Sequence, residues 1–196
     1  MNKSIEITSK HKIIPNIVDY NDVFITWLVS DTFIDLLNKV ISVKEMGYNP
    51  VPHISIRKIK NIEELIYIKN QLKKYTNIIL LIRGSGKQEG EFNTVQDVIK
   101  TGILNNFKIG VAGFPEGNNS LNYHQSLKIL KNKTKYASFV VSQFTFNKKS
   151  IKRFLDDSPL PVYLGLPNKC SFKQLLKFGR MCGIENSIKY SLNNSK

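Results

Sequence analysis

The stretch Phe-Lys-Ile-Gly-Val-Ala-Gly-Phe-Pro-Glu-Gly-Asn-Asn-Ser, residues 107–120, decides the fold class, because an apolar strand there runs directly into a turn-rich loop. Ile109, Val111 and Ala112 have the small or branched side chains typical of a strand that is covered on both faces. Gly113, Pro115 and Gly117 then predict an irregular turn, in which glycine supplies unusual dihedral angles. In α/β folds, ligands bind just outside the carboxyl ends of parallel strands, so this loop is a candidate binding segment. An ordinary strand-to-helix connection is the alternative.

Similar strand candidates recur along the whole chain and alternate with helical periodicity. The predicted strands are residues 4–8, 23–28, 51–56, 78–82, 108–112, 138–141 and 162–166. The apolar stripes that predict helices are residues 33–41, 65–72, 95–99, 127–130, 151–155 and 172–178, with Asp31 and Asn61 as capping signals.

This alternation predicts an α/β fold with a mostly parallel sheet and right-handed crossovers. The Gly-x-Gly-x-x-Gly turn of a doubly wound sheet is absent after the early strands, which favours a TIM (β/α) barrel. An eight-unit barrel takes about 250 residues, whereas seven βα units are recognised in these 196 residues. We therefore expect a shortened or incomplete TIM barrel that forms a single domain, residues 1–196.

The composition excludes several kinds of partner and site. The formal net charge is +14, but the lysines are scattered over many helices without an arginine-rich stripe, so we expect no nucleic-acid partner. Two separated cysteines, Cys170 and Cys182, and three distant histidines predict neither disulfides nor a metal site. No apolar run approaches the roughly 20 residues of a membrane helix and no signal peptide is recognised. We expect a cytoplasmic protein without a membrane partner.

Polar residues gather at the carboxyl ends of the predicted strands. They are Glu6, His53, Arg57, Arg83, Glu116 and Gln143. Each also has a structural interpretation: Glu6 could be a solvated outward residue, His53 a core histidine, and Gln143 a partner for backbone groups. If they serve one site, Glu6, His53 and Gln143 converge on it.

Five segments carry a resemblance to a known family. They read Ser-Ile-Glu-Ile-Thr at 4–8, Pro-Val-Pro-His-Ile-Ser-Ile-Arg at 50–57, Gly-Val-Ala-Gly-Phe-Pro-Glu-Gly at 110–117, Ser-Gln-Phe-Thr-Phe-Asn at 142–147 and Pro-Val-Tyr-Leu-Gly-Leu at 161–166. In this order, at these strand ends, the chain resembles the methylenetetrahydrofolate reductase family and its short single-domain relatives. The resemblance implies an oxidoreductase that passes a hydride from NAD(P)H through FAD to 5,10-methylenetetrahydrofolate, a folate substrate, and yields 5-methyltetrahydrofolate in one-carbon and methionine metabolism.

The resemblance also implies residue roles. Glu6 matches the general acid that helps to open the five-membered ring of the folate, and Gln143 matches the glutamine that hydrogen-bonds the pterin. Phe144 is expected to flank the pterin or nicotinamide ring. The positions that match cofactor-binding residues are Thr26, His53, Arg83, Gly84, Ala112, Phe114, Glu116, Asn118 and Lys131.

Departures from the family pattern support an alternative. Ser85 stands where the family has an Asp near the flavin, Phe114 where Tyr is usual and Asn118 where His is common. Some members of the group work without a tightly held flavin. The alternative is a folate-binding or flavin-binding member that lacks reductase chemistry and acts as the partner subunit of a one-carbon enzyme. An open barrel would expose strands 4–8 and 162–166, which a homo-oligomer or a partner subunit would cover. The preference between NADH and NADPH stays open.

Overall fold

The computed structural model describes residues 3–11, 20–84, 86–118 and 120–166. The predicted helical stripe at residues 172–178 and both cysteines lie outside the described residues. Contacts divide the chain into two compact units, Met1–Gly110 and Val111–Lys196. Each unit is described by itself.

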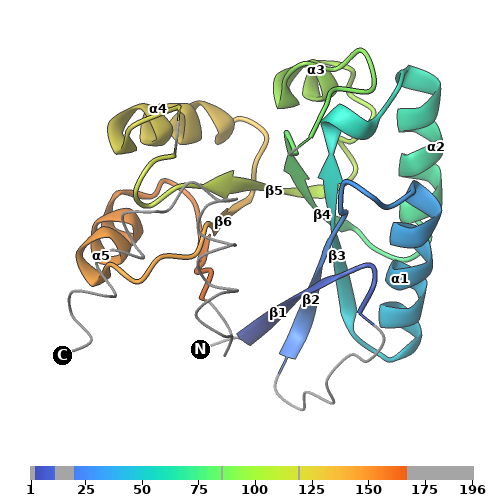
Figure 1. Ribbon diagram of the computed structural model, residues 1–196, viewed down its shortest axis with the longest axis horizontal. Coiled ribbons are helices and arrows are strands. Elements are labelled where there is room, and N and C mark those ends of the chain that lie inside the picture. The colour runs from blue at the N-terminus through green and yellow to red at the C-terminus, as the bar shows by residue number, and fades with distance from the viewer. Residues whose placement is uncertain (1–2, 12–19, 85, 119, 167–196) are drawn as a thin grey trace. The chain divides into compact units, whose positions relative to one another are not determined.

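Strands and helices alternate through both units (Figure 1). The first unit holds β1 (Lys3–Thr8), β2 (Tyr20–Thr26), α1 (Phe33–Glu45), β3 (Asn49–Ser55), a 3-10 turn η1 (Ile56–Lys58), α2 (Ile62–Leu72), β4 (Ile78–Ile82), α3 (Val95–Lys100) and the start of β5 (Lys108–Gly113). The second holds the end of β5, α4 (Tyr123–Lys133), β6 (Phe139–Ser142), α5 (Lys148–Asp157) and β7 (Val162–Tyr163).

The strands follow the order of the chain, β1-β2-β3-β4-β5 in the first unit and β5-β6-β7 in the second. Neighbours are parallel: β1 pairs with β2, β2 with β3, β3 with β4, and β6 with β7. Parallel strands in chain order, joined by helices, are the plan of a TIM-type barrel. The described residues contain seven such strands, so the predicted α/β class and incomplete TIM-like barrel are confirmed.

Helix α1 shows how the apolar stripes build the core of the first unit. Leu36, Val40 and Val43 are fully buried, with spacings of four and three residues that place them on one helix face. This face packs on β2 and β3, and α1 also contacts α2 (Figure 1). Helix α2 buries Leu65, Ile68 and Leu72 in the same manner. The spacing that predicted these helices is therefore the spacing that fills the core.

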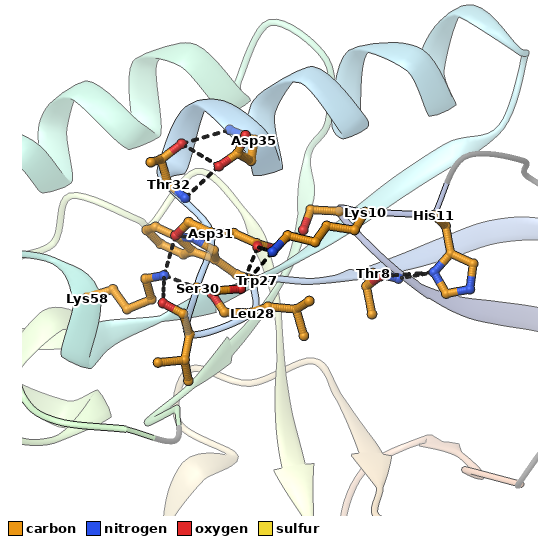
Figure 2. A network of polar contacts seen from close by, with 12 residues as sticks. Thr8, Lys10, His11, Trp27, Leu28, Ser30, Asp31, Thr32, Asp35 and Lys58 are labelled. Atoms are coloured by element: carbon orange, nitrogen blue, oxygen red, sulfur yellow. Dashed lines mark hydrogen bonds and ion pairs between the residues drawn. The ribbon is translucent and has the colours of Figure 1, made fainter. Parts of the chain in front are cut away.

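Side-chain caps set the helix starts. Asn61 caps α2 as predicted, and its side chain accepts from the Glu64 amide. For α1 the expected cap, Asp31, is wrong: Thr32 is the N-cap, its hydroxyl accepting from the Asp35 amide at 3.2 Å. The Asp35 carboxylate accepts from the Thr32 amide at 2.7 Å, which completes a capping box (Figure 2). Asp31 is drawn into a different set of contacts, described below.

No helix in the described ranges is both long enough and apolar enough to cross a lipid bilayer.

Replacing Thr32 by Ala removes the hydroxyl of this capping box. We expect the free energy of unfolding to fall by about 1 kcal/mol, because one amide of the first turn loses its partner. Thr32→Ser keeps the hydroxyl and should retain most of the stability. Urea unfolding followed by far-UV circular dichroism measures both variants, and equal losses for Ala and Ser would contradict the cap.

Candidate functional site

Five of the predicted site residues lie in the first unit, at or near the carboxyl ends of its parallel strands. Glu6 is in β1, Thr26 ends β2, His53 is in β3, and Arg83 and Gly84 follow β4. Because neighbouring parallel strands end at the same edge of the sheet, this topology gathers polar groups from separate chain segments.

Glu6 and Thr26 are in direct contact. The Thr26 hydroxyl donates to Glu6 Oε1 at 2.7 Å. The Glu6 side chain is exposed, which agrees with the outward interpretation, and it is held by a neighbouring strand rather than left free in solvent. The structure thus brings together a predicted acid and a predicted cofactor-binding residue.

His53 is buried, with 6% of its surface exposed. Its ring meets the ring of Phe24 edge to face, with 6.0 Å between centroids, and Phe24 lies opposite Glu6 in the β1–β2 register. Burial lowers the pKa of His53, and the negative charge of Glu6 partly opposes that shift. Its Nε2 atom is buried without a hydrogen-bond partner among the described residues. The imidazole is therefore neutral at pH 7, and one of its ring nitrogens has no hydrogen-bond partner among the described residues.

Gly84 is a point of close packing. It has a φ of +83°, and a Cβ placed on it would lie 1.7 Å from Ser55 Oγ. The loop after β4 is held further by Arg57, whose backbone amide donates to the Arg83 carbonyl at 3.3 Å and whose Nη1 donates to the Gly86 carbonyl at 2.8 Å. A glycine is thus required at position 84 for backbone reasons, whatever it binds.

The sequence did not predict that Asp31 is a buried carboxylate with several polar partners (Figure 2). Asp31 is 3% exposed and accepts hydrogen bonds from the hydroxyls of Ser9 and Ser30, and it forms an ion pair with Lys10 at 3.1 Å. Burial acts to raise the pKa of Asp31, but the hydrogen bonds and the Lys10 charge outweigh it and lower the pKa. Polar residues directly after two neighbouring strands were the available signal.

Lys58 holds the same loop from the other side (Figure 2). Its ammonium donates to the carbonyls of Leu28 at 2.8 Å and Val29 at 3.1 Å, and to the carbonyl of Asp31. The ammonium also lies 4.8 Å from the ring centroid of Trp27. Burial lowers the pKa of Lys58, and the negative charges of nearby carboxylates partly oppose this shift. Residues 27–31, which follow Thr26, are consequently fixed by a buried cation.

In the second unit, β5 and β6 bring Gln143 beside Gly113. The backbone N–H of Gln143 donates to the Gly113 carbonyl at 2.8 Å. The side-chain Oε1 of Gln143 is buried without a partner among the described residues. Gly113 was expected to supply unusual dihedral angles, and this is wrong: its φ is not positive. A Cβ at Gly113 would lie 2.5 Å from Phe154 Cζ and 2.6 Å from Val140 Cγ2, so close packing requires the glycine.

Polar side chains in the loop after β5 form hydrogen bonds within the second unit. The Thr145 hydroxyl donates to Glu116 Oε1, and Asn118 Oδ1 accepts from the amides of Ser120 and Leu121, each at 2.9 Å. Gly117 has a φ of +79° and turns the chain there as predicted. Glu116 and Asn118 therefore have structural tasks, and their cofactor contacts stay predictions.

An aromatic and charged cluster, also missed from the sequence, supports this loop. The Arg153 guanidinium carbon lies 3.6 Å from the ring centroid of Tyr123, and its Nη2 donates to the Pro115 carbonyl at 3.3 Å. The Tyr123 hydroxyl donates to Asp157 at 2.6 Å. Burial, with the Asp157 carboxylate, raises the pKa of Tyr123 to about 12.

The remaining predicted residues of the second unit are not drawn into one cluster. Ala112 and Phe114 are half-buried, and Phe144 packs edge to face on Phe146 with 6.1 Å between centroids. Lys131 is exposed on α4. Their roles, and the approach of Gln143 to Glu6 and His53, stay predictions. The described residues hold no cluster of three or more His, Cys, Asp or Glu side chains suited to a metal ion.

Two glycines of the first unit allow a matched test of the Gly84 packing. Gly47 has a similar φ of +85°, but a Cβ placed on it would have no atom within 4 Å. Gly47→Ala should cost about 1–2 kcal/mol of unfolding free energy from left-handed strain alone. Gly84→Ala should cost more, because the Ser55 hydroxyl must move, and adding Ser55→Ala should recover part of the loss. Urea unfolding midpoints measure all three variants; equal losses at both glycines would exclude the packing role.

The buried His53 predicts a dependence of stability on pH. Its folded-state pKa lies below the ordinary value of 6.5, so below that pH the unfolded chain binds a proton that the folded chain does not. Stability should fall on acidification from about pH 6.5, by up to about 1.4 kcal/mol per pH unit from this group. Urea unfolding at a series of pH values should show a weaker dependence for His53→Gln. His124→Gln, on the exposed surface of α4, is the control, and parallel profiles for wild type and His53→Gln would refute the assignment.

Comparisons with known proteins bear on the resemblance. A family model described as methylenetetrahydrofolate reductase matches residues 38–188, which is more than half of the chain; Glu6 and Thr26 precede these residues, and His53 and Gln143 lie within them. The chain is also similar in fold to an uncharacterized protein from Clostridium thermocellum that binds two copies of 5-methyl-5,6,7,8-tetrahydrofolic acid. The TM-score is 0.69 at 15% sequence identity, over 98% of this chain and 75% of that chain. This chain belongs to the methylenetetrahydrofolate reductase family.

Proposed function

We propose that this protein binds a reduced folate at the carboxyl ends of its strands and reduces 5,10-methylenetetrahydrofolate to 5-methyltetrahydrofolate with NAD(P)H. The observation that carries the proposal is the Glu6 carboxylate, held by Thr26 at 2.7 Å beside the buried His53. Family membership and the methyltetrahydrofolate ligand of the similar structure support the substrate class. A cytoplasmic location, expected from the sequence, belongs to the same proposal.

Two buried polar atoms fit a flavin or a pterin, which are flat heterocycles rimmed with hydrogen-bonding groups. They are His53 Nε2 in the first unit and Gln143 Oε1 in the second, each without a partner among the described residues. An orphaned buried polar atom costs about 1–3 kcal/mol, which a ligand hydrogen bond would offset. When bound, FAD would carry the hydride between the nicotinamide and the folate. In the first unit we assign His53, Thr26, Arg83 and Gly84 to hold such a ring. In the second unit we assign this role to Gln143.

Glu6 supplies the acid chemistry in this proposal. Opening the five-membered ring of the folate breaks a carbon–nitrogen bond, and the departing nitrogen needs a proton. Glu6 in its protonated state gives that proton from the oxygen that Thr26 does not contact. His53 is neutral because burial lowers its pKa. It therefore orients the ligand without adding a positive charge to the site.

Ser85 favours a second candidate function. It stands where the family has an aspartate, and a serine supplies no negative charge. A folate-binding member without reductase activity, acting as the partner subunit of a one-carbon enzyme, accounts for that change. Its signature would be tight folate binding with no nicotinamide oxidation, together with a hetero-oligomer. A homo-oligomer that covers the edge strands is compatible with either function, and light scattering after size-exclusion chromatography measures it.

The deciding experiment uses the purified protein. Its visible spectrum reports bound flavin, calorimetry reports 5-methyltetrahydrofolate binding, and nicotinamide oxidation with methylenetetrahydrofolate is followed with and without added FAD. We expect binding and turnover. Folate binding without turnover under either condition would select the second function, and absence of binding would refute both.

Glu6→Gln separates chemistry from binding. We expect turnover to fall by about 10²–10⁴-fold, because the amide cannot deliver a proton, while folate affinity stays within about twofold. Glu45→Gln, an exposed change at the end of α1, is the control and should match wild type. Turnover by Glu6→Gln equal to that of wild type would remove Glu6 as the acid.

A further inference from the structure

Thr26 is placed to control the Glu6 side chain. It is the last residue of β2, and the parallel register sets Thr26 opposite Thr8 and Phe24 opposite Glu6. Residues two apart on one strand share a face of the sheet, so Thr26 lies on the diagonal from Glu6. From that position its hydroxyl donates to Glu6 Oε1 at 2.7 Å.

This bond makes the two carboxylate oxygens unequal. A threonine hydroxyl has a single hydrogen, and here that hydrogen is given to Oε1. No other described residue provides a hydrogen bond to Glu6, so Oε2 is the oxygen left for a ligand. An exposed glutamate on its own would sample several rotamers, whereas this one is tied at a single atom.

Thr26 is itself held on both sides. Its backbone belongs to the β1–β2 ladder, and the chain that follows is fixed where Lys58 donates to the Leu28 and Val29 carbonyls (Figure 2). The buried Trp27 packs beneath the same ammonium. A side chain on such a fixed backbone positions its partner more accurately than one on a free loop does.

We infer that Thr26 is a positioning residue that orients the Glu6 carboxylate, with Oε1 anchored and Oε2 turned to the ligand. The positioning role itself is independent of the proposed function, whereas the expected effect of Thr26 on turnover rests on it. It assigns Thr26 a task other than the flavin contact that the family resemblance implies. While the bond to Glu6 is kept, any ligand atom at Thr26 Oγ1 must be a hydrogen-bond donor.

The test compares Thr26→Val, Thr26→Ser and a matched control, Thr8→Val. The control removes a hydroxyl directly across the ladder that contacts His11 and not Glu6. Methylene relaxation by NMR in glutamate-labelled protein reports the order of the Glu6 side chain. We expect Thr26→Val to lower that order to the level of an exposed surface glutamate such as Glu45, whereas Thr26→Ser and Thr8→Val keep it.

The same variants are assayed for folate binding and turnover. Thr26→Val should lower kcat about tenfold with KM and 5-methyltetrahydrofolate affinity within about twofold, and Thr26→Ser should restore kcat. An unchanged Glu6 order in Thr26→Val, or a loss in Thr26→Ser as large as in Thr26→Val, would overturn the inference. Wild-type protein without folate binding or turnover would refute the proposed function, while a loosened Glu6 in Thr26→Val would still uphold the positioning role.

Discussion

The parallel register of β1 and β2 is the constraint on which the candidate site of the first unit depends. Ile5 lies opposite Val23 and Thr8 opposite Thr26, and this sets the Glu6 carboxylate within reach of the Thr26 hydroxyl. A slip of one residue would turn every side chain of a strand to the other face of the sheet. The register is secured by buried apolar neighbours, among them Ile7, Val23 and Ile25. Packing of hydrocarbon thereby determines the position of an acid.

Buried polar groups in this protein divide into satisfied and unsatisfied ones. Asp31 and Lys58 are surrounded by partners, and the Ser142 hydroxyl accepts from the Gly165 amide at 2.9 Å. His53 Nε2 and Gln143 Oε1 are without a partner among the described residues, as are Ser55 Oγ, Arg57 Nε and Ser126 Oγ. His53 and Gln143 both belong to the segments that carry the family resemblance. Desolvated atoms of this kind weaken the folded state unless a ligand pairs with them.

Each unit stabilises one strand-end loop by the same device. In the first unit the Lys58 ammonium lies near the Trp27 ring and donates to the Leu28 carbonyl. In the second, the Arg153 guanidinium lies on the Tyr123 ring and donates to the Pro115 carbonyl. A cation that combines a π face with backbone carbonyls satisfies groups that a buried loop would otherwise leave unpaired. Loops held in this way can present side chains with little loss of order.

The amino-acid sequence by itself determined the alternation of strands and helices, the cap at Asn61 and, through five ordered segments, the family. These properties are local, because hydrophobic periodicity and capping are expressed within a few neighbouring residues. Tertiary structure alone decided that Thr26 holds Glu6, which is 20 residues away, and that Gly113 is required by Phe154. Such contacts join segments far apart in the chain, and strand register and side-chain rotamers select them, so no local pattern encodes them.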